Sequence, residues 1–269
     1  MGRLGDAGRR GGWVAGCLLG GVLITMLWAP PEAWSTADSV RKLQLDRQRA
    51  ELLKEGKRVY EKYCVGCHGE KGDGKGPAAR FLDPKPRDFT LGVFKFRSTP
   101  SGSLPTDQDL HRTLMRGVLR TSMPAWVLVP EQEKIAVMEY IKTFAKDVWA
   151  ESEPPRPLFI PEPPEYVGTP ESTQRGKVVY EEMKCWECHG KEGKGDGPKA
   201  AELKDDWGNP IKPFDFTSGA LKGGAGVKDI YRTFTTGLDG TPMPSFADSL
   251  SEEDRWHLVS YILSLRQGR

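Results

Sequence analysis

Two short motifs hold the residues best suited to chemistry. "CVGCH" begins at Cys64 and "CWECH" begins at Cys185, so each motif has two cysteines three positions apart and a histidine directly after the second. A glycine-rich stretch follows each histidine, "GEKGDGKGP" in the first copy and "GKEGKGDGP" in the second. Each motif therefore offers two thiols for covalent bonds and one imidazole for a metal.

The C-x-x-C-H pattern is the signature of covalent c-type haem attachment. The three-residue step brings both thiols to the two vinyl groups at one edge of the ring, and the adjacent histidine reaches the iron from one face. Glycines after the motif let the backbone pass close to the porphyrin. The sequence predicts two covalently bound haems, held by Cys64, Cys67, His68, Cys185, Cys188 and His189.

Two other cysteine chemistries fit the motifs less well than haem. A zinc site of four cysteines would leave both histidines without a role and would join pairs from two separate, complete copies. A thioredoxin-like redox pair needs a βαβ setting, and no such pattern is present. Haem attachment remains the better explanation of both motifs.

A methionine in each copy is the expected sixth ligand of the iron. After His189 the only methionine is Met243, in "TPMPSF", and Met123, in "TSMPAW", aligns with it in the first copy. Met115 aligns with Thr235, and Met138 is expected in the core. The predicted iron ligands are His68, Met123, His189 and Met243. His111 and His257 have no histidine at the matching position of the other copy and are expected to be ordinary polar side chains.

The motifs belong to a longer internal repeat. "PRDFT" at Pro86 matches "PFDFT" at Pro213, and "HRTLMRGVLRTSMPAW" at His111 matches "YRTFTTGLDGTPMPSF" at Tyr231. Between the copies, residues 151–170 contain seven prolines, which predicts an extended linker rather than a helix. We expect domains at 36–150 and 171–269.

The regular segments of both copies are predicted to be helices. Helical spacing of apolar residues or helix-end signals favour helices over 43–63, 107–116, 131–146, 228–235 and 252–265, with Ser251 and Asp254 as a capping pair. No convincing alternating strand pattern is found. The fold is therefore expected to be all-α, with much loop around a ligand.

Residues 1–35 resemble a signal peptide or an uncleaved membrane anchor. Arg3, Arg9 and Arg10 precede the apolar run "WVAGCLLGGVLITMLW" from Trp13 to Trp28. "VAGC", ending at Cys17, looks like a lipidation site but lies at the start of the apolar run rather than at its end. All three interpretations predict export of the rest of the chain.

The net charge and its distribution along the chain bear on the kind of partner that the protein binds. The net charge of the 269 residues is +2, which does not favour nucleic-acid binding. Residues 36–150 carry 21 Lys and Arg against 15 Asp and Glu, a net of +6, whereas residues 151–269 carry 15 against 20, a net of −5. This asymmetry concerns docking to partners more than folding.

Both copies resemble class I cytochrome c domains, over about Arg49 to Phe144 and Arg175 to Leu265, and the whole resembles an exported tandem dihaem cytochrome c. The resemblance implies that first and last helices cross beside the haem, with Gly56 against Tyr140 and Gly176 against Tyr261. It also implies that the carbonyls at Pro77 and Pro198 accept hydrogen bonds from the haem-binding histidines. Long insertions, Asp83 to Ser103 and Asp205 to Gly226, depart from the shortest members of the family.

These observations predict an electron-transfer protein with redox protein partners. Two His/Met haems would pass single electrons between a dehydrogenase or quinol-oxidising complex and a terminal oxidase or reductase, in the bacterial periplasm or at the outer face of the membrane. An alternative is a dihaem enzyme, a peroxidase or sulfur-compound dehydrogenase, in which one iron has a displaceable ligand; His111 is the one hint of it. A sensor would need a signalling domain, which the sequence does not contain.

Overall fold

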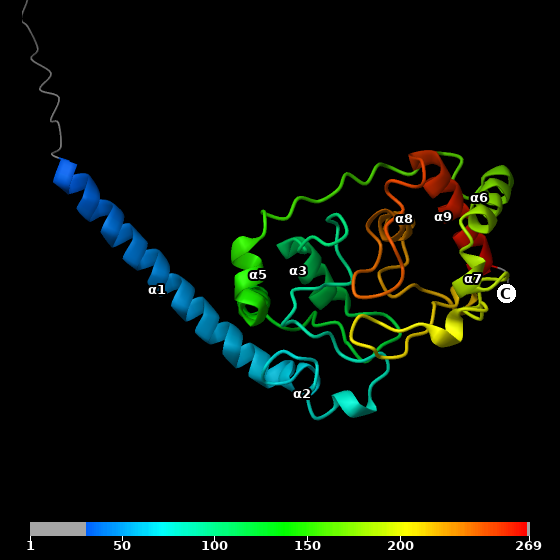
Figure 1. The fold of residues 1–269 in the computed structure, drawn as a ribbon. Coiled ribbons are helices and arrows are strands. Elements are labelled where there is room, and N and C mark those ends of the chain that lie inside the picture. The colour runs from blue at the N-terminus through cyan, green and yellow to red at the C-terminus, as the bar shows by residue number, and fades with distance from the viewer. Residues whose placement is uncertain (1–30, 268–269) are drawn as a thin grey trace, which may run out of the picture. The chain divides into compact units, whose positions relative to one another are not determined.

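The computed structural model describes residues 31–267, and this part of the chain is helical without strands, as expected (Figure 1). A single antiparallel bridge joins Lys204 to Pro210. The first copy contains α1 (Pro31–Tyr63), α2 (Val65–His68), η1 (Ala79–Phe81), α3 (Asp107–Arg116), α4 (Glu131–Lys142), η2 (Thr143–Ala145) and α5 (Lys146–Glu151). The second contains α6 (Pro170–Glu182), α7 (Trp186–His189), η3 (Ala200–Glu202), η4 (Phe216–Ser218), α8 (Val227–Thr236) and α9 (Glu252–Gln267).

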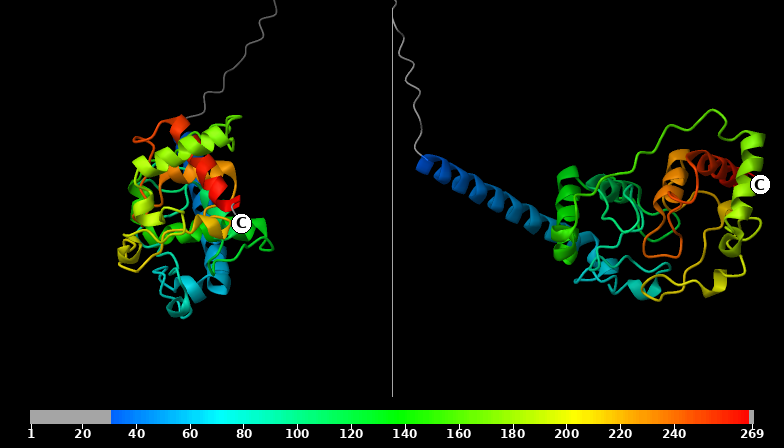
Figure 2. Two further views of the ribbon diagram at one scale, coloured as in Figure 1. Left: turned by 90° about the vertical axis from the view of Figure 1, so that its right-hand side faces the viewer. Right: turned by 45° about the horizontal axis from the view of Figure 1, so that its top comes forward.

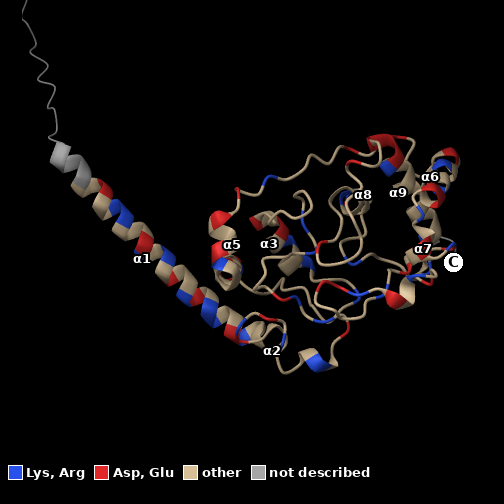
Figure 3. Ribbon diagram, in the orientation of Figure 1, with Lys and Arg blue, Asp and Glu red and all other residues tan. Residues whose placement is uncertain are grey.

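Contacts divide the chain into a unit of residues 1–46 and a unit of residues 47–269. In the first unit, residues 36–46 of α1 are exposed and carry both basic and acidic side chains (Figure 3). In the described part of the chain, no helix combines the length and the apolar character that a membrane span requires. The apolar run 13–28 and Cys17, on which the signal and anchor interpretations rest, lie outside the described residues.

Each copy has its own hydrophobic core. In the first, the end of α1 packs with α3 and α4, and in the second α6 packs with α8 and α9, with α6 and α9 side by side (Figure 2). The most deeply buried members are Val59, Tyr60 and Val137 in one core and Ile230, Trp256 and Val259 in the other. The predicted duplication is therefore a duplication of folded domains.

Glycine allows the first and last helices of each copy to cross closely. A Cβ on Gly56 would overlap the carbonyl oxygen of Ala136 and lie 2.7 Å from the Cβ of Tyr140. In the second copy, a Cβ on Gly176 would overlap the carbonyl oxygen of His257 and lie 2.9 Å from the Cβ of Tyr261. The predicted contacts of both glycines are thus confirmed.

The helix expected over 131–146 is shorter than predicted. α4 ends at Lys142, a 3-10 turn follows, and α5 runs to Glu151 after Ala145, whose φ of −127° and ψ of 45° are not helical. The break lets the indole of Trp149 pack edge-on against Phe94, with ring centroids 6.2 Å apart. Burial of apolar surface on the first core therefore outweighs the propensity to extend α4.

The linker follows the protein surface without helix from Ser152 to Thr169. The amide of Leu158 donates a hydrogen bond to the carbonyl of Ser98 at 2.8 Å, and Ile160 and Tyr166 pack against the second core. Pro170 then begins α6, with Thr169 as its N-cap. At α9, the amide of Asp254 donates to the Ser251 hydroxyl at 3.0 Å, so the predicted cap is present.

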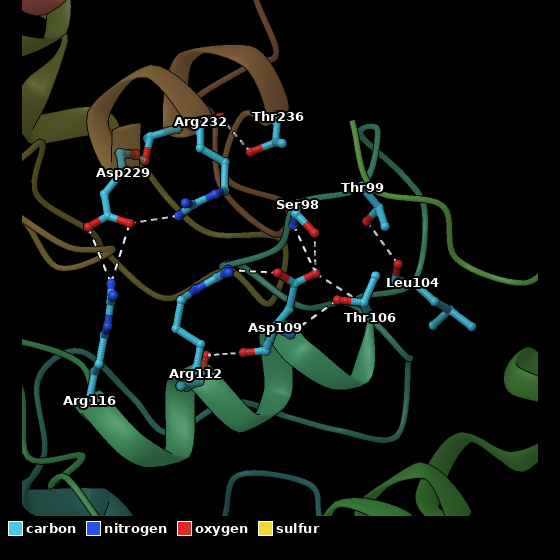
Figure 4. A network of polar contacts seen from close by, with 12 residues as sticks. Ser98, Thr99, Leu104, Thr106, Asp109, Arg112, Arg116, Asp229, Arg232 and Thr236 are labelled. Atoms are coloured by element: carbon cyan, nitrogen blue, oxygen red, sulfur yellow. Dashed lines mark hydrogen bonds and ion pairs between the residues drawn. The ribbon is translucent and has the colours of Figure 1, made fainter. Parts of the chain in front are cut away.

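The inserted loops of the two copies join them within the unit 47–269. Arg97, 1% exposed, donates hydrogen bonds to the carbonyl of Thr236 and to Asp239 Oδ1, both at 2.7 Å. The Arg87 guanidinium lies over the Trp207 ring, 4.4 Å from its centroid. Outside the inserted loops, a guanidinium nitrogen of Arg116 in α3 lies 3.3 Å from the carboxylate of Asp229 in α8 (Figure 4). Contact with the other repeat is thus one role of the insertions, through Arg87, Arg97 and Trp207.

Candidate haem sites

Each C-x-x-C-H motif forms one helical turn directly after the first helix of its copy. The backbone then folds back over this turn: the amide of Gly76 donates to the carbonyl of Cys67, and that of Gly197 to the carbonyl of Cys188, both at 3.1 Å. A Cβ on Gly76 would lie 2.5 Å from the carbonyl oxygen of Val65. Gly76 and Gly197 are therefore required because the chain lies directly against the backbone of the motif. From the sequence, glycines are expected here only because the backbone passes close to the porphyrin.

Both motif histidines are half-buried and oriented by the same pair of contacts. The Nδ1–H of His68 donates to the carbonyl of Arg87 at 2.9 Å, and its ring stacks on Phe89 with centroids 4.5 Å apart. His189 repeats this with the carbonyl of Phe214 at 3.1 Å and the ring of Phe216 at 4.6 Å. Burial lowers the pKa of both histidines, which favours the neutral imidazole. With Nδ1 occupied, Nε2 is the nitrogen left for a metal.

The prediction that the carbonyls of Pro77 and Pro198 accept the hydrogen bonds from the motif histidines was wrong. Both prolines are exposed at the start of the turn that follows each glycine-rich stretch. The acceptors lie 19 and 25 residues after the histidines, in the shared "PRDFT" and "PFDFT" segments. In each segment an aspartate fixes a tight turn, because Asp88 accepts from the amide of Thr90 at 2.8 Å and Asp215 from that of Thr217 at 2.9 Å. The repeat of P-x-D-F-T was the signal that could have identified them.

The two predicted methionine ligands occupy the same turn in each copy. The amide of Val118 donates to the carbonyl of Met123, and the amide of Leu238 to that of Met243, both at 3.0 Å. The hydroxyls of Thr121 and Thr241 accept from the amides of these methionines at 3.1 and 3.3 Å. This shared geometry supports an equivalent role for Met123 and Met243.

In the first copy, one cavity brings the motif and the methionine together. It is lined by Cys64, Cys67, His68 and Met123, and by an apolar wall of Phe89, Phe94, Leu110, Leu114, Met138 and Ile141. In the second copy, Met243 and Cys185 pack against the same hydrophobic core. Thiols, imidazole, thioether and apolar walls suit a large apolar ring that carries iron.

The first thiol of each motif is neutral in its half-buried setting. Burial raises the pKa of Cys64 to about 12 and that of Cys185 to about 11. Within residues 31–267, no group of three or more His, Cys, Asp or Glu side chains is arranged to hold a metal ion, so a four-cysteine zinc site has no support. The donor set of each copy fits haem.

The remaining candidates are engaged elsewhere. Met115 Sδ lies 2.9 Å from the ammonium of Lys134, and Met138 belongs to the first core, although it also lines the cavity. His111 Nε2 lies 2.7 Å from Glu131, and His257 Nδ1 lies 2.9 Å from the Ser172 hydroxyl. These contacts support the expectation that the two histidines are ordinary polar side chains.

Comparisons with known proteins agree with this geometry. Residues 173–266 match the family model described as cytochrome c, and residues 51–141 match that of cytochrome c oxidase, cbb3-type, subunit III. A chain of the Kuenenia stuttgartiensis reducing HAO-like protein complex Kustc0457/Kustc0458 is 50% identical, with a TM-score of 0.76. The match covers 78% of this chain and 95% of that chain. Among curated proteins, none matches significantly. The chain belongs to the c-type cytochromes, with two cytochrome c domains in tandem that each bind a covalent haem.

Proposed function

We propose that this cytochrome is an electron-transfer protein whose two haems are each ligated by histidine and methionine. The ligand pairs are His68 with Met123 and His189 with Met243. The observation that carries the proposal is the identical turn around both methionines, with a threonine hydroxyl holding each amide. Methionine in the sixth position leaves no open site for a substrate and raises the reduction potential above that of bis-histidine haem.

The contacts between the repeats also support a relay. The Arg97–Asp239 ion pair joins the repeats, with the side chain of Arg97 fully buried. Such a pair holds its geometry firmly, because breaking it would leave a charge buried without a partner. A fixed spacing between two haems suits passage of electrons from one to the other. A dihaem enzyme would need polar groups on the open side of one iron, and the one histidine that hinted at this, His111, contacts Glu131.

The partners are proposed to be other redox proteins, with this chain as a subunit or a shuttle. The solved chain with 50% identity comes from a reducing HAO-like protein complex, which supports assembly with a larger redox protein. We place the chain in a respiratory-type pathway, between a dehydrogenase or quinol-oxidising complex and a terminal oxidase or reductase. Export to the periplasm or the outer membrane face, with the N-terminal segment cleaved or retained, is part of the same proposal.

Equilibrium redox titration of the holoprotein, followed by its absorption spectrum, tests this function. Two one-electron transitions are expected, with spectra of six-coordinate low-spin haem in both oxidation states. The reduced protein should bind no carbon monoxide, because both sixth positions are filled. Rapid carbon monoxide binding at one haem, or catalytic turnover of peroxide, would support the enzyme alternative and contradict the proposal.

A further inference from the structure

Two lysines at equivalent positions of the repeats lie close to each other. Lys95 follows "PRDFT" and Lys222 follows "PFDFT", each six residues after the shared phenylalanine. Although Lys222 belongs to the second repeat, it lines the cavity of the first haem site, beside Lys95 and Arg87. The first site is therefore completed by a cation from the other domain.

These three cations repel one another in a half-buried setting. Burial, together with the positive charges of Arg87 and Lys222, lowers the pKa of Lys95 to about 8. Burial also lowers the pKa of Arg87 to about 10 and that of Lys222. Burying like charges together is unfavourable unless an anion accompanies them.

The protein supplies no direct counter-ion in its described part. Several carboxylates act on the cluster through space: Asp83 on Lys222, Asp205 on Lys95, and Asp88, Asp205, Asp206 and Asp239 on Arg87. Within residues 36–266, however, no carboxylate lies at ion-pair distance from any of the three cations. The Nη1 atom of Arg87 is buried and has no hydrogen-bond partner. The cluster thus leaves hydrogen-bond donors without a direct anionic partner at the wall of the haem cavity.

We propose that Lys222, together with Lys95 and Arg87, binds the propionate carboxylates of the first haem, so that the second repeat sets the potential of the first. The proposal rests on the haem sites and the electron-transfer function proposed above. Positive charge near an iron favours its reduced state, which carries one positive charge fewer. The second copy has Phe214 where the first has Arg87, so the cluster is not duplicated by the sequence repeat.

The test measures both haem midpoint potentials in the holoprotein with Lys222→Gln. Met243→His, made in the same background, moves the second haem's potential and so assigns the other. Lys222→Gln should shift the reduction equilibrium of the first haem about three- to tenfold toward the oxidised form, or about 28 to 59 mV. Lys222→Arg should retain the wild-type potential. Lys177→Gln, the same charge change at an exposed position on α6, should leave the first haem's potential unchanged.

Three results would overturn the proposal. One is an unchanged first-haem potential in Lys222→Gln, and another is an equal shift in Lys177→Gln. The third is a shift that depends on added phosphate, which would mean that the cluster binds an anion from solution. The far-red band of methionine ligation, recorded in each variant, tests the proposed His/Met ligation separately from the potential. Failure of the lysine proposal can therefore be distinguished from failure of the proposed function.

Discussion

In the first repeat the carbonyl of Arg87 holds His68 and the ring of Phe89 stacks on it, and in the second Phe214 and Phe216 do the same for His189. The hydroxyls of Tyr60 and Tyr180 also donate to equivalent glycine carbonyls, each at 2.7 Å. The surroundings differ much more. After its methionine the first repeat exposes Val127 and Leu128, whereas the second has Ala247 and Asp248.

The two repeats share the contacts that orient the side chains at the haem site, but they differ in the charge and the apolar exposure around it. Contacts that orient the motif histidines and the two methionines are the same in both repeats, which is what the proposed equivalent ligation requires. Side chains farther out differ: Arg87 and Arg120 of the first repeat correspond to Phe214 and Gly240 of the second. Charge and apolar exposure around each haem are thus set independently of its ligands, which allows one chain to contain two haems of unequal potential and unequal partners.

Methionine removal tests the shared part of the comparison and should have the largest effect. Met123→Ala and Met243→Ala should each lower the potential of their own haem by on the order of 0.1 V and open the iron, while covalent attachment remains. Redox titration and a denatured mass for two haems provide the measurement. Met115→Ala is the control, since that sulfur contacts Lys134. If Met115 rather than Met123 governs the first haem, the repeat alignment is wrong.

Loss of Asp239 tests whether the repeats behave as one unit. Asp239→Ala leaves the buried guanidinium of Arg97 without its carboxylate, which should lower the free energy of unfolding by about 3 kcal/mol. Arg116→Ala breaks a more exposed ion pair to Asp229 and should cost less than about 1 kcal/mol. Denaturant unfolding of the holoproteins measures both. Equal costs would show that the Arg97 contact does not hold the repeats together.

Alanine at the helix-crossing glycines tests whether both domains pack alike. Gly56→Ala and Gly176→Ala should each destabilise their domain by about 1–3 kcal/mol, because the added Cβ overlaps a carbonyl oxygen of the last helix. Gly66→Ala is a matched control, since a Cβ there meets nothing within 4 Å. Thermal unfolding followed by haem absorbance is the measurement. A tolerated change at one glycine only would show that the crossings differ.

Ionic strength should have the smallest effect, and it tests the unequal charge of the repeats. Lys57, Lys62, Lys71 and Lys75 are exposed near the first motif, so the negatively charged oxidant ferricyanide should react faster with the first haem at low salt. Raising the salt to physiological strength should slow this reaction about two- to fivefold. Stopped-flow oxidation measures it, with Lys71→Gln expected to reduce the dependence on salt. A rate that does not fall with salt would remove the argument for electrostatic steering.

The sequence identified the cysteines, the histidine and the methionine that line the first haem cavity, but it did not identify the backbone carbonyls that orient the histidines. Cys64, Cys67 and His68 were assigned from fixed spacing, and Met123 from its alignment with Met243, because local motifs in duplicate carry their own evidence. The carbonyl acceptors of Arg87 and Phe214 were missed, because a backbone acceptor does not require a particular residue type and only the repeated P-x-D-F-T segment pointed to it.

The contacts between repeats could not be predicted for a different reason. Arg97 and Asp239 are 142 residues apart and correspond to Gly224 and Leu119 in the other copies, so neither repetition nor spacing points to their pairing. The break after Lys142 was missed because it depends on the packing of Trp149 against Phe94, and that contact exists only in the folded domain.

The oxidised absorption spectrum of the holoprotein tests most directly whether both irons have the same ligands. Ligation of Fe(III) by methionine sulfur produces a weak far-red band, and its intensity can be compared with the amount of haem in the same sample. We predict a band with the intensity of two methionine-ligated haems per chain, which falls by half in either Met123→Ala or Met243→Ala. A band of half that intensity in the wild-type protein, or none, would contradict equivalent ligation in the two repeats.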